Sequence, residues 1–152
     1  MLVNDVVTEP MNTRKVEERF CQPMPSPAIL VVEGQESVRR LLDIALGQYG
    51  FTVRLAAGGM EALDLYRQHR DCIALVLLDV QMDDLDGPGT LAALKEINPH
   101  VRCCFMSGHT GPYSTGQLLA MGAAHVLAKP FRSLPELAQT LWEVASGRQE
   151  GR

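Results

Sequence analysis

The chain has 152 residues, of which 46% are hydrophobic, and a formal net charge of −4. Such a length and composition indicate one globular domain with its own core, and the negative charge gives no electrostatic reason for direct binding to nucleic acid. No apolar run approaches the roughly 18 residues that a transmembrane helix needs. The N-terminus is unlike a signal peptide, because its first basic residue is Arg14 and no apolar stretch follows it. We therefore expect a cytoplasmic protein.

The N-terminal region differs from the rest of the chain. Four prolines lie within residues 1–27, and three of them fall at 23–27. A proline-rich stretch of this kind is typical of a linker. We predict a flexible extension over 1–27, a folded domain over 28–148 and a C-terminal tail at 149–152.

Strands and helices alternate from residue 28 onward. Short apolar runs rich in branched side chains predict strands, at 28–32, 51–56, 73–78, 101–106 and 124–128. Apolar residues at helical spacing predict the helices between and after them, at 36–49, 60–70, 88–97, 113–121 and from 134 to a frayed end at 147. Five βα units with short connections predict an α/β fold, with a parallel sheet covered by helices on both faces.

The four cysteines, Cys21, Cys72, Cys103 and Cys104, show no Cys-x-x-Cys spacing. Cys72 and the Cys103–Cys104 pair flank or lie within apolar runs. We interpret the cysteines as free thiols in a reducing compartment rather than as a disulfide framework. His100 and Cys103 do not predict a zinc site, since no second pair of ligands accompanies them.

Polar residues follow four of the predicted strands, at the edge of the sheet where open parallel sheets bind ligands. They are Glu33, Asp79, Ser107 and Lys129. A single serine or lysine in such a place is more often an ordinary loop residue, so the prediction depends on all four together. An aspartate can act as a nucleophile and form an acyl phosphate, and an ammonium and a hydroxyl can stabilise the phosphoryl oxygens. The sequence therefore predicts a pocket for a transferred phosphoryl group on Asp79.

Several short motifs make the chain resemble the response-regulator receiver domains of two-component signalling, over about residues 28–147. The matching stretches are Ile29-Leu30-Val31-Val32, Leu77-Leu78-Asp79-Val80-Gln81-Met82, Asp86-Gly87, Met106-Ser107-Gly108 and Ala128-Lys129-Pro130-Phe131. This resemblance implies a flavodoxin-like, doubly wound five-stranded parallel sheet with strand order 2-1-3-4-5.

The resemblance also implies roles for the strand-end residues. Asp79 would accept a phosphoryl group from a histidine kinase or phosphotransfer protein, and Ser107 and Lys129 would bind it. Mg²⁺ would assist, held by Glu33, Asp79 and the backbone carbonyl of Gln81.

The output of such a domain is expected to come from contacts with other proteins. No output domain follows in the sequence, so we expect a stand-alone receiver with a downstream protein partner and no direct contact with nucleic acid or membrane; a homodimer stays open. We do not expect an enzyme, because phosphohydrolases with an aspartate nucleophile place a second aspartate where this chain has Gln81. The residues expected on the output surface include Leu118, Met121, His125 and Trp142.

Two positions depart from the family's pattern. The family usually has two adjacent acidic residues after the first strand, whereas this chain has Glu33 and Gly34. Gly34 has no side chain where a direct metal ligand belongs, so we expect Mg²⁺ binding to be weak or doubtful. The switch positions are Ser107 and Val126, and at 126 the family often has an aromatic ring that turns inward on activation, which a β-branched side chain cannot do. These departures leave open an alternative, a pseudo-receiver that binds proteins without being phosphorylated.

Overall fold

The computed structural model describes residues 26–108 and 112–147, so the predicted extension lies outside the described residues except for its last two positions. The strands are β1 (Ala28–Val32), β2 (Thr52–Ala56), β3 (Ile73–Asp79), β4 (Cys103–Ser107) and β5 (His125–Ala128). The helices are α2 (Glu36–Gln48), α3 (Gly59–His69), α4 (Gly87–Ile97), α5 (Thr115–Ala120) and α6 (Leu134–Ala145). The strands form one parallel sheet in the order β2-β1-β3-β4-β5, which confirms the predicted fold.

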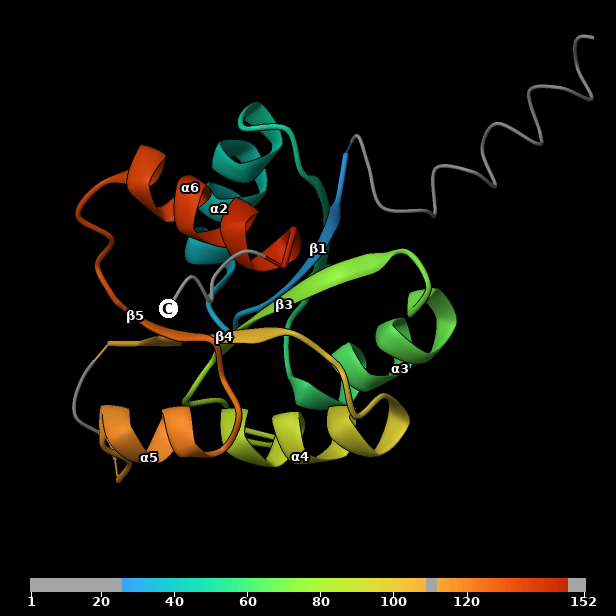
Figure 1. Cartoon of the computed structure of the whole chain (residues 1–152). Helices are drawn as coiled ribbons and strands as arrows, with labels where there is room; N and C mark the ends of the chain where they lie inside the picture. Colours follow the sequence, from blue (N-terminus) through green and yellow to red (C-terminus); the bar gives the residue numbers. More distant parts are fainter. Residues whose placement is uncertain (1–25, 109–111, 148–152) are drawn as a thin grey trace, which may run out of the picture.

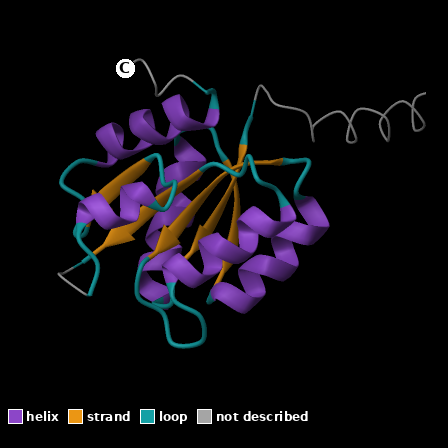
Figure 2. Cartoon of the chain, turned by 60° about the horizontal axis from the view of Figure 1, so that its bottom comes forward, coloured by secondary structure: helices purple, strands orange, loops and turns teal. Residues whose placement is uncertain are grey.

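Helices cover both faces of the sheet (Figures 1 and 2). Helices α2 and α6 pack on one face and α3, α4 and α5 on the other. Alternate residues of β1 enter the two cores, with Ile29 and Val31 on the α2–α6 side and Leu30 and Val32 on the other side. All five residues of β1 are buried, as expected for a strand that is covered on both faces. Among the described residues, no helix is long and apolar enough to cross a membrane.

An aromatic pair fastens α6 to the turn after α2. The rings of Trp142 and Phe51 lie with their centroids 5.3 Å apart, and the Trp142 indole Nε1–H donates to the backbone oxygen of Tyr49 at 2.8 Å. Trp142, which was expected on the output surface, therefore also packs α6 against the turn after α2. The expected place of Leu118 on that surface is wrong, because its side chain is 1% exposed and belongs to the core.

Most element boundaries lie within one residue of the prediction, and two elements start two residues later than predicted because of local hydrogen bonds. Helix α5 begins at Thr115, since Ser114 caps it: the Gln117 amide donates to the Ser114 hydroxyl at 3.0 Å, and the Ser114 amide donates to the Gln117 side chain at 2.8 Å. This reciprocal capping box satisfies donors that a helix start otherwise leaves unpaired. Strand β4 begins at Cys103, because the Val101 amide bonds to the Asn98 oxygen at 3.0 Å and closes a turn.

The cysteines divide into two kinds. Cys103 and Cys104 are buried free thiols, as expected, and burial raises the pKa of Cys104 to about 12. Cys72 is disulfide-bonded. The expectation of a free thiol at Cys72 is therefore wrong. Sequence spacing could not reveal the bond, because a disulfide joins residues that only the fold brings together.

Candidate functional site

Asp79 ends β3, which lies in the middle of the sheet between β1 and β4. Its side chain is 9% exposed. Burial raises the pKa of Asp79 above its ordinary value, the nearby Glu33 carboxylate raises it further, and the Lys129 ammonium opposes both effects. Asp79 thus combines a buried carboxylate with an opening to a pocket at the edge of the sheet.

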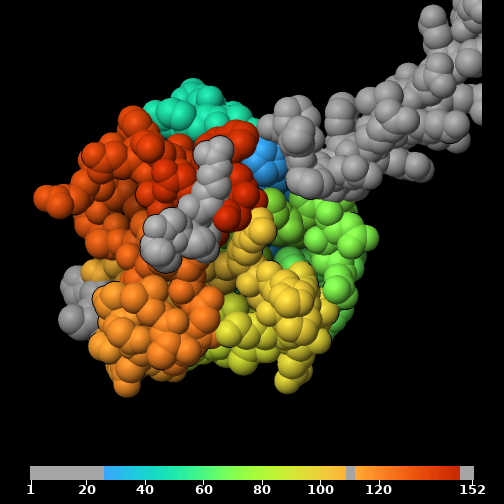
Figure 3. Space-filling view, viewed as in Figure 1, coloured from blue at the N-terminus to red at the C-terminus, as the bar shows by residue number. Residues whose placement is uncertain are grey.

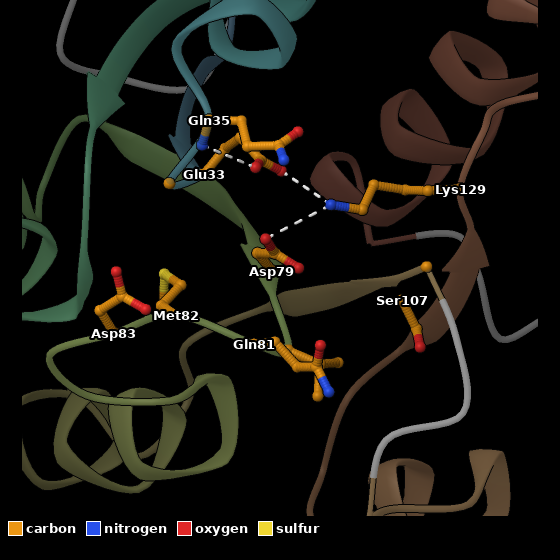
Figure 4. Close-up of a pocket in the computed structure, with 11 residues that line it drawn as sticks. Glu33, Gln35, Asp79, Gln81, Met82, Asp83, Ser107 and Lys129 are labelled. Atoms are coloured by element: carbon orange, nitrogen blue, oxygen red, sulfur yellow. Dashed lines mark hydrogen bonds and ion pairs between the residues drawn. The ribbon is translucent and has the colours of Figure 1, made fainter.

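Lys129 follows β5 and points at the carboxylates of the site (Figure 4). Its Nζ lies 3.3 Å from Asp79 Oδ2 and 3.1 Å from Glu33 Oε1. The Lys129 side chain is 20% exposed, so its charge lies partly out of water and is compensated by the two carboxylates. Asp79 and Lys129, which the sequence analysis placed together in one pocket, lie side by side.

Glu33 is the most deeply buried charged group of the site, at 1% exposure. Both of its carboxylate oxygens already have protein donors: Oε1 pairs with Lys129, and Oε2 accepts the Gln35 amide at 3.0 Å. The Glu33 backbone oxygen accepts a hydrogen bond from Arg39 Nη1 at 2.8 Å. Glu33 therefore positions Lys129 and the start of α2. The sequence analysis named Glu33 as a strand-end group and as a metal ligand, but not as the partner of Lys129.

The pocket between these groups has a volume of about 540 Å³. Ser107 ends β4 on its opposite wall, and in Figure 4 the Ser107 hydroxyl is turned away from the Asp79 carboxylate. Gln81 also reaches the pocket, from the loop after β3. The complete lining is Glu33, Gly34, Gln35, Asp79, Val80, Gln81, Met82, Asp83, Ser107, Gly108 and Lys129.

The set of groups that could hold Mg²⁺ is thin. Hard divalent cations take several oxygen ligands, yet no group of three or more histidines, cysteines or acidic residues within the described residues could hold a metal ion. Gly34 contributes no side chain, although a Cβ atom there would have the Ala57 oxygen, at 3.9 Å, as its nearest neighbour. The backbone at position 34 therefore has room for a Cβ atom.

The loop after Asp79 is held at two places. Gly87 comes so close to β3 that a Cβ atom on it would lie 2.5 Å from the Asp79 backbone oxygen. This distance is too short for any residue with a side chain. The Asp84 carboxylate accepts the amides of Gly59 and Met60 at 3.1 and 3.0 Å and so caps α3. The Met60 amide is the main reason that the pKa of Asp84 lies below its ordinary value. Asp84 and Gly87 thereby fix the path of the loop that follows Asp79.

The strand order and the ligand-binding edge define the chain as a doubly wound α/β protein of the flavodoxin-like type. The model of the response regulator receiver domain matches residues 29–141. The chain belongs to this family, the receiver domains of two-component signalling.

Two relatives agree with this assignment. Sporulation initiation phosphotransferase F of Bacillus subtilis (strain 168) is 32% identical over 108 residues, which are 71% of this chain and 86% of that protein. Sensor kinase CckA of Brucella abortus (strain 2308) is 35% identical over 119 residues, which are 78% of this chain but only 12% of that protein. The chain thus spans a small part of some relatives and most of others.

A solved structure adds to the comparison. The complex of CheX, CheY, BeF3 and Mg²⁺ from Borrelia burgdorferi superposes with a TM-score of 0.72 at 25% sequence identity, covering 78% of this chain and 88% of that one.

Proposed function

We propose that Asp79 accepts a phosphoryl group from a histidine kinase or phosphotransfer protein and that the chain then signals through a downstream protein partner. The observation that carries this proposal is the distance of 3.3 Å between Lys129 Nζ and Asp79 Oδ2, at the mouth of an open pocket. The phosphotransferase of Bacillus subtilis, with which the chain shares most of its length, supports the same reading.

The chemistry follows from the residues of the pocket. An Asp79 oxygen attacks the phosphorus of a phosphohistidine; a P–O bond forms, the P–N bond breaks, and the leaving imidazole takes up a proton from water. The Lys129 ammonium offsets the charge on the phosphoryl oxygens. The Ser107 hydroxyl donates a hydrogen bond to the new group after turning toward Asp79. The domain itself is a signalling module in this proposal and turns over no substrate.

The test is phosphorylation by acetyl phosphate in the presence of Mg²⁺, followed by intact-mass spectrometry. Wild-type protein gains the mass of one phosphoryl group, and Asp79→Asn gains none because the nucleophile is gone. Asp83→Asn is the matched control, since Asp83 lines the same pocket, and it keeps the mass gain. A wild-type protein that gains no mass would contradict the proposal.

Gly34 favours a second candidate, a pseudo-receiver that binds proteins without phosphorylation. We propose that Mg²⁺ binds weakly here, with Asp79, the Gln81 carbonyl and Glu33 as its ligands, because the side chain at 34 is missing and Glu33 is paired with Lys129. Gly34→Asp adds a carboxylate at a position where the new Cβ atom has the Ala57 oxygen, at 3.9 Å, as its nearest neighbour. A unit charge pair at about 4 Å contributes roughly 4 kcal/mol at an intermediate dielectric before desolvation is subtracted, so a net gain of about tenfold in Mg²⁺ affinity is expected.

Calorimetry with Mg²⁺ separates the two candidates. Measurable binding by wild-type protein that disappears in Asp79→Asn supports a working receiver with a weak metal site. Binding only by Gly34→Asp, together with no mass gain from acetyl phosphate in the wild type, supports the pseudo-receiver.

A further inference from the structure

Ser107 lines a second cavity besides the phosphoryl pocket. This cavity lies beside β5 and the start of α5 and has a volume of about 630 Å³. Ser107, Gly108 and Lys129 belong to the linings of both hollows. Val126 lines the second cavity from β5, and Tyr113, from the loop before α5, is the aromatic residue of its lining.

The Tyr113 hydroxyl joins the starts of two helices. It donates to Asp86 Oδ2 at 3.1 Å, and this hydrogen bond raises the pKa of Tyr113. Asp86 Oδ1 in turn accepts the Gly89 amide at 2.8 Å and caps α4. Tyr113 therefore holds the segment that leads into α5 to the start of α4, and both helices lie on the same face of the sheet (Figure 1), where they form neighbouring patches of the surface (Figure 3).

Two connections link the Tyr113–Asp86 hydrogen bond to Asp79. Asp86 lies on the loop that follows Asp79, so a short stretch of chain joins the two residues. Ser107 is the second connection: its hydroxyl faces away from Asp79 (Figure 4), and turning toward a phosphoryl group would change the wall of the cavity that Tyr113 also lines.

The far end of α5 is fastened separately. The Lys95 ammonium, on α4, donates to the backbone oxygen of Met121, the C-cap residue of α5. Loss of the Tyr113–Asp86 bond would therefore free the start of α5 while its end stays attached to α4. Val126 is a small side chain and leaves the cavity open to an aromatic ring from elsewhere.

We propose that Tyr113 is a positioning residue that restrains the unmodified domain by its hydrogen bond to Asp86 and, once Asp79 carries a phosphoryl group, leaves Asp86 so that its ring enters the cavity beside Val126. This inference rests on the proposed function, because it concerns the response to phosphorylation. It gives the domain an aromatic switch that comes from the loop before α5 instead of from β5.

The test measures binding of beryllofluoride with Mg²⁺ by amide NMR in three variants. Tyr113→Phe removes only the hydroxyl and is expected to bind beryllofluoride about three- to tenfold more tightly, as the loss of one restraining hydrogen bond predicts. Val126→Leu fills part of the cavity and is expected to weaken binding, because the ring has less room. Tyr49→Phe, on the opposite side of the sheet, is the matched control and leaves the affinity unchanged.

Opposite effects of Tyr113→Phe and Val126→Leu support the proposal, and a purely structural role would lower the stability of Tyr113→Phe without tightening binding. Wild-type affinity in Tyr113→Phe overturns it. If wild-type protein binds no beryllofluoride, the proposed function fails, and the ligand-free spectra then decide the inference. Tyr113→Phe and Asp86→Asn, which weaken the bond from its two ends, should shift the Ser107 and Gly108 amides in the same direction; amides that stay in place overturn the coupling.

Discussion

The two faces of the sheet are fastened in different ways. On the α2–α6 face, the Trp142 ring packs on Phe51 and its indole N–H donates to the Tyr49 oxygen, which fastens α6 to the turn after α2. On the α3–α4–α5 face, side chains of the loop after Asp79 bind helix starts directly, through Asp84 to α3 and Asp86 to Tyr113.

This difference indicates which face responds to a change at Asp79. Both faces have apolar cores, but among the described residues it is only on the α3–α4–α5 face that side chains of the loop after Asp79 hold helix starts through hydrogen bonds. A hydrogen bond at the surface has a small net energy and can be replaced. We therefore expect the α3–α4–α5 face to respond to phosphorylation and the α2–α6 face to act as a fixed support.

The largest effect on stability is expected from Trp142→Ala. Removal of the indole ring takes away its contact with Phe51 and its hydrogen bond, and we expect a loss of about 3 kcal/mol in the free energy of unfolding, measured by urea denaturation. The amide resonances of Ser107 and Gly108 should stay in place in the folded variant. Large shifts of those resonances would show that the α2–α6 face is coupled to the site and would break the comparison.

A smaller effect is expected from Asp84→Ala. This substitution removes the acceptor for the Gly59 and Met60 amides and should lower the free energy of unfolding by about 1 kcal/mol, as the loss of a helix cap does. Asp83→Ala is the matched control, because Asp83 is exposed, and it should change stability by less than about 0.5 kcal/mol. Equal effects of the two substitutions would show that Asp84 does not fasten the loop to α3.

The smallest effect is expected in the pH dependence of the free energy of unfolding, to which the Asp79 and Asp84 carboxylates contribute with opposite signs. The pKa of Asp79 lies above the ordinary 3.8 and that of Asp84 below it. Folded Asp79 holds its proton more tightly than the unfolded chain does, so its contribution to stability grows as pH falls through its raised pKa. The contribution of Asp84 is present above its unfolded pKa and is lost as pH falls through its lowered pKa, with a small size because the group is exposed.

Carbon NMR of the two carboxyl groups checks the order of titration. In denaturation experiments, any stability that Asp79→Asn gains over wild type at neutral pH should shrink as the solution becomes acidic. A difference that grows in acid would contradict the raised pKa of Asp79.

Much of the fold could be predicted because it depends on local patterns. The buried runs before Glu33 and Asp79 specify strands covered on both faces, and alternation with amphipathic helices specifies a parallel sheet. Once the sheet is known, the strand ends bring Asp79 and Lys129 together without further information.

The contacts that tune the site could not be predicted in the same way. The pairing of Glu33 with Lys129 and the cap that Asp84 gives to α3 join residues distant in sequence, and each depends on the direction of a side chain. An acidic residue in a loop has the same appearance in sequence whether it lies in solvent or accepts two amides. The bond between Tyr113 and Asp86 was missed for that reason.

The contact between Gly87 and the backbone of Asp79 has a consequence for engineering this domain. In a library in which every position is varied in turn, position 87 should accept almost no replacement, while position 34 should accept many. Residue 87 is therefore a poor place to insert a probe or a fusion joint, and its intolerance would mark the loop after Asp79 even in a screen that never measures signalling.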